Sequence, residues 1–450
     1  MFTNILNLSA YKVLRVEETE YDYHIRTELA QPPTHCPICR SDHLLRHGRN
    51  EQLVRDLPIH GKRVGIYVDT QRWRCQACGK TFMDQLPAVN AKREMTDRLV
   101  EWIGQQSLRR TFASIAEDIG LDEKTVRNIF RDYVDELEKT VRFETPTWMG
   151  IDEIHLIRPR CVISNIHSNT VVNLLPNRDK KTVVGYLANL DGRHEVQTVA
   201  MDMWVPYRDA VQAVMPDARI VIDKFHVVKM ANDAVEKVRK SLRESLTPKQ
   251  RRGLMHDRFV LLKRERDLND KGRLLLSGWT ANYPELGEAY RIKEAFYGVY
   301  EDMGTPAQAL ARYEAWYRSV SPGVRDAFAD LIRAFTNWRP PILAYFEHPI
   351  TNAYTESLNN LIRVMNRLGR GYSFEALRAK ILFTEGVHSK AKPTFRRREV
   401  MADDVLSRAA PGTVEHMAMF TISQHAEPEP EKNFGADIST LTKLIEEGKL

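Results

Sequence analysis

One carboxylate lies inside a stretch of the chain that otherwise has the pattern of a buried β-strand. The stretch is TWMGIDEIHLI, residues 147–157, and alternation along a strand directs Asp152 and Glu153 to opposite faces. A buried carboxylate must be paired, hydrogen-bonded or bound to a metal. Asp152 is therefore a candidate metal ligand, and a metal site around it requires further ligands from other parts of the chain.

Four of the five cysteines form two Cys-x-x-Cys pairs, CPIC at Cys36 and Cys39 and CQAC at Cys75 and Cys78. Each pair presents two sulfurs on one tight turn, and four sulfurs suit tetrahedral structural Zn²⁺. A thioredoxin-like redox pair is the alternative, but it needs one Cys-x-x-Cys in a βαβ setting, which this region lacks. The sequence predicts a zinc-binding module, preceded by a β-hairpin, over residues 1–88.

The pattern becomes helical over residues 89–145, and FASIAEDIGLDEKTVRNIFRDYV is typical of a helix-turn-helix. Gly120 supplies the turn, and Asp122 can cap the second helix. Helical hairpins that never meet DNA share this pattern, but the neighbouring zinc module favours DNA binding. The residues predicted to contact DNA from the second helix are Lys124, Thr125, Arg127, Asn128 and Arg131.

Residues 146–226 contain three predicted antiparallel strands, and helices and strands then alternate. This order predicts a ribonuclease H-like α/β domain. In that fold the first and fourth strands are neighbours, so Asp202, at the end of the fourth strand, is the predicted partner of Asp152. Asp223, at the end of the fifth strand, lies one strand further out.

A helical stretch over residues 227–349 interrupts this domain, which resumes over residues 350–400. There TNAYTESLNNLIR predicts a helix capped by Thr351, with Glu356 and Asn359 on one exposed face. Glu356 is placed to be a third carboxylate, although a glutamate on an amphipathic helix more often lies on a solvated face.

The predicted fold class is multidomain α+β. A zinc-binding module, a helix-turn-helix domain and a ribonuclease H-like catalytic domain, interrupted by an all-helical insertion, precede a C-terminal tail over residues 401–450.

Basic residues gather between Asn360 and Val400, although the net charge of the whole chain is only +6. Such a cluster suits a phosphate backbone, and a solvated basic face is the alternative. Arg363, Arg367 and Arg370 are the first predicted phosphate contacts. The other basic residues are Arg378, Lys380, Lys390, Lys392, Arg396, Arg397 and Arg398.

Several motifs occur in a specific order: CPIC, CQACGKTF, the helix-turn-helix, GIDEIH, MDMW, VIDKFHVVK and TNAYTESLNNLIR. In this order they resemble the ISL3 family of bacterial insertion-sequence transposases, over roughly residues 36–383. The resemblance implies a zinc-binding end-recognition module, a helix-turn-helix and a catalytic domain of the retroviral-integrase superfamily with an Asp-Asp-Glu (DDE) triad.

Carried over to this sequence, the family's motifs match Asp152 in GIDE to the first aspartate and Glu356 in TESLNN to the glutamate. The second aspartate stays open, because Asp202 in MDM and Asp223 in DKFH both match family motifs, and strand order favours Asp202. Asp223 and His226 also resemble a (Cys/Asp)-x-x-His motif of related transposases, which shapes the site. A hydrogen-bonded core histidine is the alternative for His226.

The resemblance implies phosphoryl transfer at two divalent ions, Mg²⁺ or Mn²⁺, held by the three carboxylates. The expected protein binds double-stranded DNA at the terminal inverted repeats of its element, cleaves the element ends and joins the 3′-ends to target DNA. Joining two ends requires two active sites, so a homodimer is expected. A catalytically inactive, transposase-derived DNA-binding regulator is the alternative.

The sequence has no run of about 18 or more apolar residues and no secretory signal pattern. We therefore expect no membrane partner and a location in the bacterial cytoplasm, associated with the nucleoid.

Overall fold

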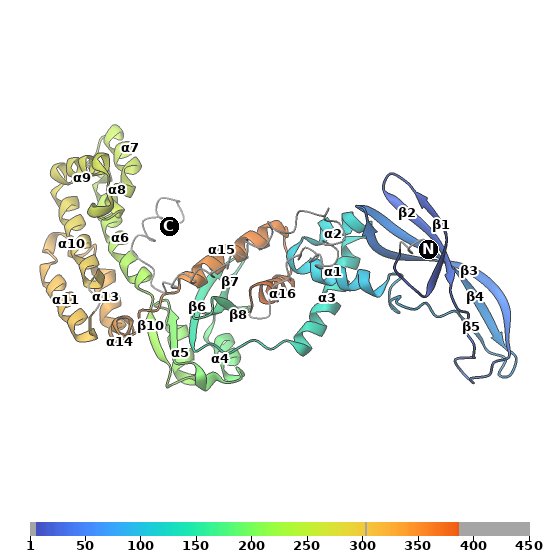
Figure 1. Cartoon of the computed structure of the whole chain (residues 1–450). Helices are drawn as coiled ribbons and strands as arrows, with labels where there is room; N and C mark the ends of the chain where they lie inside the picture. Colours follow the sequence, from blue (N-terminus) through green and yellow to red (C-terminus); the bar gives the residue numbers. More distant parts are fainter. Residues whose placement is uncertain (1–5, 302–303, 387–450) are drawn as a thin grey trace, which may run out of the picture. The chain divides into compact units, whose positions relative to one another are not determined.

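The computed structural model describes residues 6–301 and 304–386 (Figure 1). These residues divide into two compact units. The first unit comprises residues 6–147, 152–195 and 354–386, and the second comprises residues 148–151, 196–301 and 304–353. The predicted tail and the basic residues from Lys390 to Arg398 lie outside the described residues.

The first unit begins with a five-stranded sheet in which β1, β2, β4 and β3 lie in that order and β5 pairs with β4. The predicted N-terminal hairpin is present, since β1 and β2 pair antiparallel. Buried Val64, Ile66 and Val68 alternate along β4 and form the core of this sheet with Ile25. The strands are β1 (Tyr11–Glu18), β2 (Asp22–Leu29), β3 (Leu44–Ile59), β4 (Lys62–Cys75) and β5 (Thr81–Met83).

Three helices follow, α1 (Asp97–Arg109), α2 (Phe112–Ile119) and α3 (Glu123–Thr140), and they confirm the predicted helix-turn-helix. Gly120 ends α2 in the left-handed conformation, with φ of 64°, which glycine adopts without steric strain. Asp122 caps α3, because its side chain accepts a hydrogen bond from the Thr125 backbone N–H.

The helix-turn-helix shares one hydrophobic core with other parts of the first unit. Ile115 and Val126 belong to the same buried cluster as Leu174 of β8 and Leu382 of α16. Helix α3 is therefore packed onto the rest of the unit. These other parts are β7 (Pro159–Asn165), β8 (Thr170–Leu175), α4 (Lys180–Ala188), α15 (Ala353–Leu368) and α16 (Phe374–Glu385).

A buried lysine joins α16 to the helix-turn-helix. Lys380 is 1% exposed, and its Nζ donates hydrogen bonds to the backbone oxygens of Ser107 and Arg110 at the end of α1. The Nζ also lies 4.6 Å from the ring centre of Phe112 and 4.8 Å from that of Tyr372. The sequence placed Lys380 among exposed phosphate contacts, and this prediction was wrong, because its amine is used to satisfy buried carbonyls.

We expect Lys380→Met to lower the free energy of unfolding by about 2–4 kcal/mol, because it leaves buried carbonyl groups without donors. Chemical denaturation measures the change, and Lys181→Met on the exposed side of α4 is the control, with an expected effect within about 0.5 kcal/mol. An equal, small effect of both substitutions would contradict this role.

Burial lowers the pKa of Lys380 to about 7, from an ordinary value of 10.5. Between these two pH values the unfolded chain binds more protons at this site than the folded chain, so the site's contribution to stability grows as pH rises. The destabilisation by Lys380→Met is therefore expected to be larger at pH 9 than at pH 6, as denaturation at the two pH values would show.

The second unit contains a parallel arrangement of β6 (Trp148–His155), β9 (Thr198–Met201) and β10 (Arg219–Ile222). β6 begins in the second unit and continues into the first, and within the second unit β9 lies between β10 and the beginning of β6. β9 is thus the neighbour of β6, as the sequence predicted for the first and fourth strands. Helix α5 (Val205–Val214) connects β9 to β10.

The residues after β10 form helices with an aromatic core. Phe296 and Trp316 pack edge to face at 4.9 Å, and the Trp316 indole N–H donates to the backbone oxygen of Ile292. The helices are α6 (Lys224–Ser241), α7 (Pro248–His256), α8 (Arg258–Leu262), α9 (Asp270–Asn282), α10 (Pro284–Glu301), α11 (Pro306–Ser319), α12 (Pro322–Arg325), α13 (Ala329–Asn337) and α14 (Arg339–Leu343). Short 3-10 helices cover Arg193–Glu195, Leu242–Glu244, Glu265–Asp267 and Ala344–Phe346.

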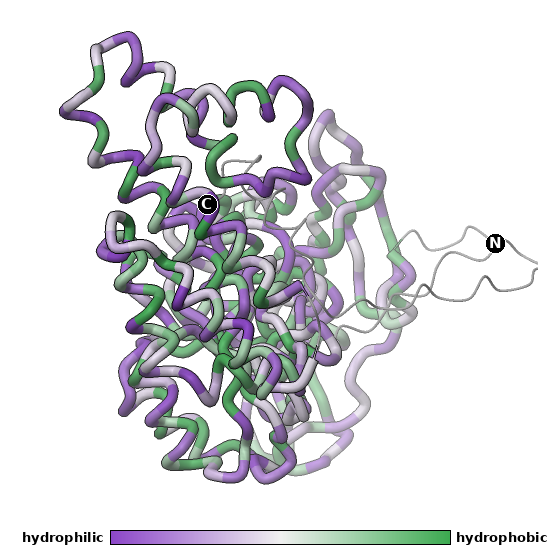
Figure 2. Tube along the Cα trace, turned by 90° about the vertical axis from the view of Figure 1, so that its left-hand side faces the viewer, coloured by the Kyte–Doolittle hydropathy of each residue, from purple (hydrophilic) through white to green (hydrophobic). Residues whose placement is uncertain are grey.

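Hydrophobic and hydrophilic residues alternate at short intervals along the chain (Figure 2). Within the described residues, no helix combines the length and the apolar character that crossing a membrane requires.

Candidate active site and zinc centre

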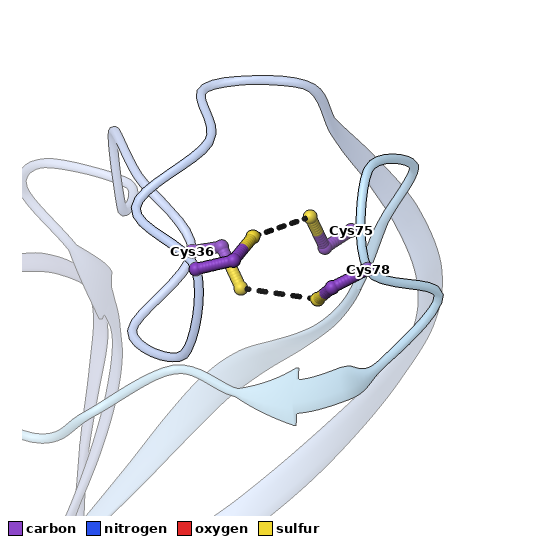
Figure 3. Close-up of side chains that lie close together, drawn as sticks. Cys36, Cys75 and Cys78 are labelled. Atoms are coloured by element: carbon purple, nitrogen blue, oxygen red, sulfur yellow. Dashed lines mark hydrogen bonds between the residues drawn. The ribbon is translucent and has the colours of Figure 1, made fainter.

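The four cysteine sulfurs of the two Cys-x-x-Cys pairs lie together (Figure 3), all within 4.8 Å of one another. Cys36 Sγ is 3.8 Å from Cys78 Sγ, and Cys39 Sγ is 3.5 Å from Cys75 Sγ. Four sulfurs bound to one Zn²⁺ at about 2.3 Å in a tetrahedron lie about 3.8 Å apart. The donor set and its spacing therefore fit a structural zinc ion.

Each cysteine pair sits on the same kind of backbone turn. Arg40 N–H donates to Cys36 O, and Gly79 N–H donates to Cys75 O, both at 2.9 Å. Arg40 and Gly79 both have positive φ, 62° and 71°, so the chain reverses directly after each pair. The strain at Arg40 is a local cost of presenting two sulfurs in one direction.

Asp152 lies on β6 in the first unit and is 9% exposed. Its Oδ2 accepts a hydrogen bond of 2.8 Å from Asn359 Nδ2, and its Oδ1 accepts one of 2.7 Å from the Glu153 backbone N–H. Asn359 is on α15, one turn after Glu356, so both side chains project from neighbouring positions of that helix. Asn359 Oδ1 is buried and has no hydrogen-bond partner among the described residues.

Asp202 directly follows β9 in the second unit. Its Oδ1 lies 2.6 Å from His226 Nε2, and His226 is in the first turn of α6. The Asp202 side chain keeps 27% of its surface exposed, so a ligand can still reach it. The imidazole of His226 and the carboxylate of Asp202 are therefore in direct contact.

Asp223 is enclosed by the second unit and is 4% exposed. It caps α6 by accepting from the Phe225 backbone N–H, and its other oxygen accepts from the Asn352 backbone N–H, both at 3.0 Å. Burial raises the pKa of Asp223 above its ordinary value. Both oxygens are therefore used within the fold.

The pairing of β6 with β9 ends at Ile151 and Met201, which are partners in the register. In the chain, Asp152 follows Ile151 within β6, and Asp202 follows the last residue of β9. Asp223 follows β10, which pairs with β9 on its other side.

The outward-facing side of α3 carries the predicted DNA contacts. Lys124, Arg127 and Arg131 are exposed, while Val126 and Ile129 of the same helix are buried. Arg127 pairs with Glu123 and lies 5.8 Å from the ring centre of Phe112. Thr125 and Asn128 are partly exposed between these residues.

Comparison with known protein families finds a model described as a transposase that matches residues 149–381, more than half of the chain. The chain belongs to the ISL3 family of transposases. Two further models match in front of it: the zinc-finger of transposases IS204, IS1001, IS1096 and IS1165 over residues 32–78, and the helix-turn-helix domain of transposase family ISL3 over residues 85–134. The predicted family and the order of its domains are confirmed.

Curated relatives of this ISL3 chain are also transposases. The transposase for insertion sequence element IS1001 of Bordetella parapertussis is 26% identical over 351 residues, which cover 75% of this chain and 85% of that protein. The transposase for IS1557 of Mycobacterium tuberculosis, strain CDC 1551 / Oshkosh, is 25% identical over 396 residues, which cover 81% of this chain and 80% of the relative.

The sequence missed two asparagines of this ISL3 chain. Asn359, expected on the exposed face with Glu356, is 3% exposed and turns toward Asp152. Asn352 was not considered, but its side chain donates to Ile151 O and its backbone N–H to Asp223. The helix begins at Ala353, so Asn352, and not the predicted Thr351, directly precedes it. The available signal was that both asparagines lie within four residues of Glu356, but their hydrogen-bond partners lie 129 to 207 residues away in the chain.

Proposed function

We propose that this ISL3 transposase binds the terminal inverted repeats of its insertion sequence, cleaves the element ends and joins the 3′-ends to target DNA. Support comes from the family and from relatives named as transposases of IS1001 and IS1557. The sequence resemblance, in addition, matches Asp152 and Glu356 to the first and last carboxylates of the family's triad. The observation that carries most weight is the match of the transposase model to residues 149–381, a range that contains Asp152, Asp202 and Glu356.

Asp152, Asp202 and Glu356 would hold the catalytic Mg²⁺ or Mn²⁺. Carboxylate oxygens are the ligand atoms that these ions prefer. Asn359 Oδ1, beside Asp152, is buried and has no hydrogen-bond partner among the described residues, so a further polar ligand such as a hydrated ion could be bound there. When bound, the ions supply charge stabilisation at the attacking and leaving oxygens of the phosphoryl transfer.

The protein side chains around these carboxylates have separate tasks. Asn359 orients Asp152 through its hydrogen bond, and His226 orients Asp202. Asp223 has a structural role, because one of its oxygens caps α6 and the other accepts a hydrogen bond from the Asn352 backbone N–H. We assign the second catalytic aspartate to Asp202 on these grounds.

DNA is the partner of α3 in this proposal, through Lys124, Thr125, Arg127, Asn128 and Arg131, with the N-terminal half of the helix against base edges. Arg363, Arg367 and Arg370 of the other basic segment contact phosphates. A homodimer is proposed because two element ends must be joined in one assembly.

The function is tested with duplexes made from the DNA that flanks the gene, carrying the element end. We expect selective binding of these duplexes and, with Mg²⁺, a nick at the element end that gel electrophoresis of labelled strands reveals. Selective binding without metal-dependent nicking would identify a DNA-binding regulator and contradict the proposed cleavage.

Asn359→Ala removes the hydrogen bond to Asp152 Oδ2 and is expected to raise the Mg²⁺ concentration for half-maximal cleavage about 10- to 100-fold. Magnesium titrations of the nicking rate measure this shift. Asn360→Ala, at the exposed neighbouring position of α15, is the matched control and should leave the titration unchanged. Coinciding titration curves for Asn359→Ala and the wild type would contradict the orienting role.

A further inference from the structure

Two exposed arginines lie where α15 ends: Arg367 is in the last turn of the helix, and Arg370 follows it in the turn before α16. Arg370 and Gly371 have positive φ, 49° and 103°, and the Arg370 N–H donates to Arg367 O at 3.2 Å. The chain therefore reverses tightly at the end of α15, and both arginines are exposed there. We call Arg367–Gly371 the basic turn.

Tyr372, which directly follows the basic turn, packs against the helix-turn-helix. The Tyr372 ring lies 5.3 Å from the ring of Phe112 at the start of α2, in an edge-to-face arrangement. A Cβ at Gly369 would collide with the Tyr372 ring, so the glycine allows the ring to lie against the turn. The tyrosine thus links the turn to α2.

Tyr372 also lies near the beginning of α3, since it lines the same groove as Lys124. Burial raises the pKa of its hydroxyl, and the Glu123 carboxylate in the first turn of α3 raises it further. Lys380 makes a cation–π contact with the same tyrosine, with 4.8 Å between its Nζ and the ring centre. Contacts with Phe112 of α2 and Lys380 of α16 therefore fix the residue that follows the basic turn, and this residue lines the same groove as Lys124 of α3.

A groove of about 500 Å³ separates α3 from the beginning of α16. Lys124, Arg127 and Arg131 line its α3 side, and Tyr372 and Arg378 line the other side. Arg378 is not a free cation here, since it pairs with Glu138 and donates to Asn173. The exposed positive charge that lines the groove therefore comes from α3, and the basic turn precedes the lining residue Tyr372 in the chain.

We propose that α3 and the basic turn form one DNA-binding surface, in which α3 enters the major groove and Arg367 and Arg370 bind phosphates of the same duplex segment. The inference rests on the proposed function and adds that the predicted phosphate contacts Arg367 and Arg370 bind the same duplex segment as α3. Phosphates border a major groove about 12 Å wide, so a helix in the groove brings its flanking surface onto the backbone.

The surface is tested with Arg367→Ala/Arg370→Ala in the full-length protein. Fluorescence anisotropy measures the binding of a labelled element-end duplex and of an unrelated duplex of equal length, between 50 and 300 mM salt. Loss of two phosphate contacts should reduce the slope of log K against log salt by about 2 for both duplexes. This change corresponds to about 100-fold weaker binding at 0.1 M salt, relative to a 1 M reference. The control is Arg318→Ala on an exposed position of α11, which should leave the slope unchanged.

Each other outcome has a defined meaning. Wild-type affinity and slope together with slower cleavage would place the arginines at the metals and overturn the inference. Unchanged binding and unchanged cleavage would show a solvated basic face and overturn it as well. Failure of the wild-type protein to prefer the element end would overturn the proposed function, and the inference with it.

Discussion

Asp202→Asn is expected to reduce Mg²⁺-dependent nicking of element-end DNA by at least about 10³-fold, while Asp223→Asn keeps it within about tenfold of wild type. Loss of a metal-binding carboxylate removes several kcal/mol of charge stabilisation in the transition state, and about 4 kcal/mol corresponds to 10³-fold. Asp223 instead accepts two backbone hydrogen bonds, and an asparagine oxygen can keep one of them. Single-turnover cleavage of a labelled duplex measures both variants.

Binding and stability serve as controls for this pair. Asp202→Asn should bind the end duplex as the wild type does, because the carboxylate does not contact DNA in this account. Asp223→Asn should lower the free energy of unfolding by about 1–3 kcal/mol, through loss of a buried hydrogen bond. Full cleavage by Asp202→Asn with none by Asp223→Asn would reverse the assignment.

Removal of zinc is expected to unfold the cysteine-bearing part of the first sheet. Structural zinc contributes on the order of 10 kcal/mol or more in small modules, and the knuckles at Cys36–Cys39 and Cys75–Cys78 have little apolar core of their own. Native mass spectrometry should find one zinc ion per chain. Chelation should then abolish the hydrogen-exchange protection of the ends of β3 and β4.

Cys78→Ser and Cys161→Ser form a matched pair for this prediction. Cys161 is buried in β7 and is not one of the clustered cysteines, so its variant should keep one zinc ion, whereas Cys78→Ser should bind zinc weakly. Full protection of residues 36–83 in the metal-free protein would contradict a structural zinc site.

Features encoded by neighbouring residues were predictable. The two Cys-x-x-Cys pairs, the Gly120 turn and the Asp122 cap all depend on spacings of a few residues, and the structure confirms these local features. The neighbouring position of β9 and β6 also followed from the order of strands, because that order restricts the topology.

Features that depend on distant partners were not predictable. Lys380 has the pattern of a solvated basic residue, and only the packing of α16 against α1 shows that it satisfies carbonyls about 270 residues away. Asn359 was placed on the wrong face because helical periodicity defines neighbours on the helix, and the buried polar partner on β6 decides its direction. In both cases a polar group on a remote strand or helix outweighs the local pattern.

The claim that Asp152, Asp202 and Glu356 share bound metal is tested most directly without DNA. Fe²⁺ replaces Mg²⁺, ascorbate and peroxide generate hydroxyl radicals at the bound iron, and mass spectrometry locates the cuts in the polypeptide. We predict cuts close to residues 152, 202 and 356 that excess Mg²⁺ suppresses and that Asp152→Asn removes together. Cuts that miss any of these three positions, or that persist in Asp152→Asn, would contradict the claim.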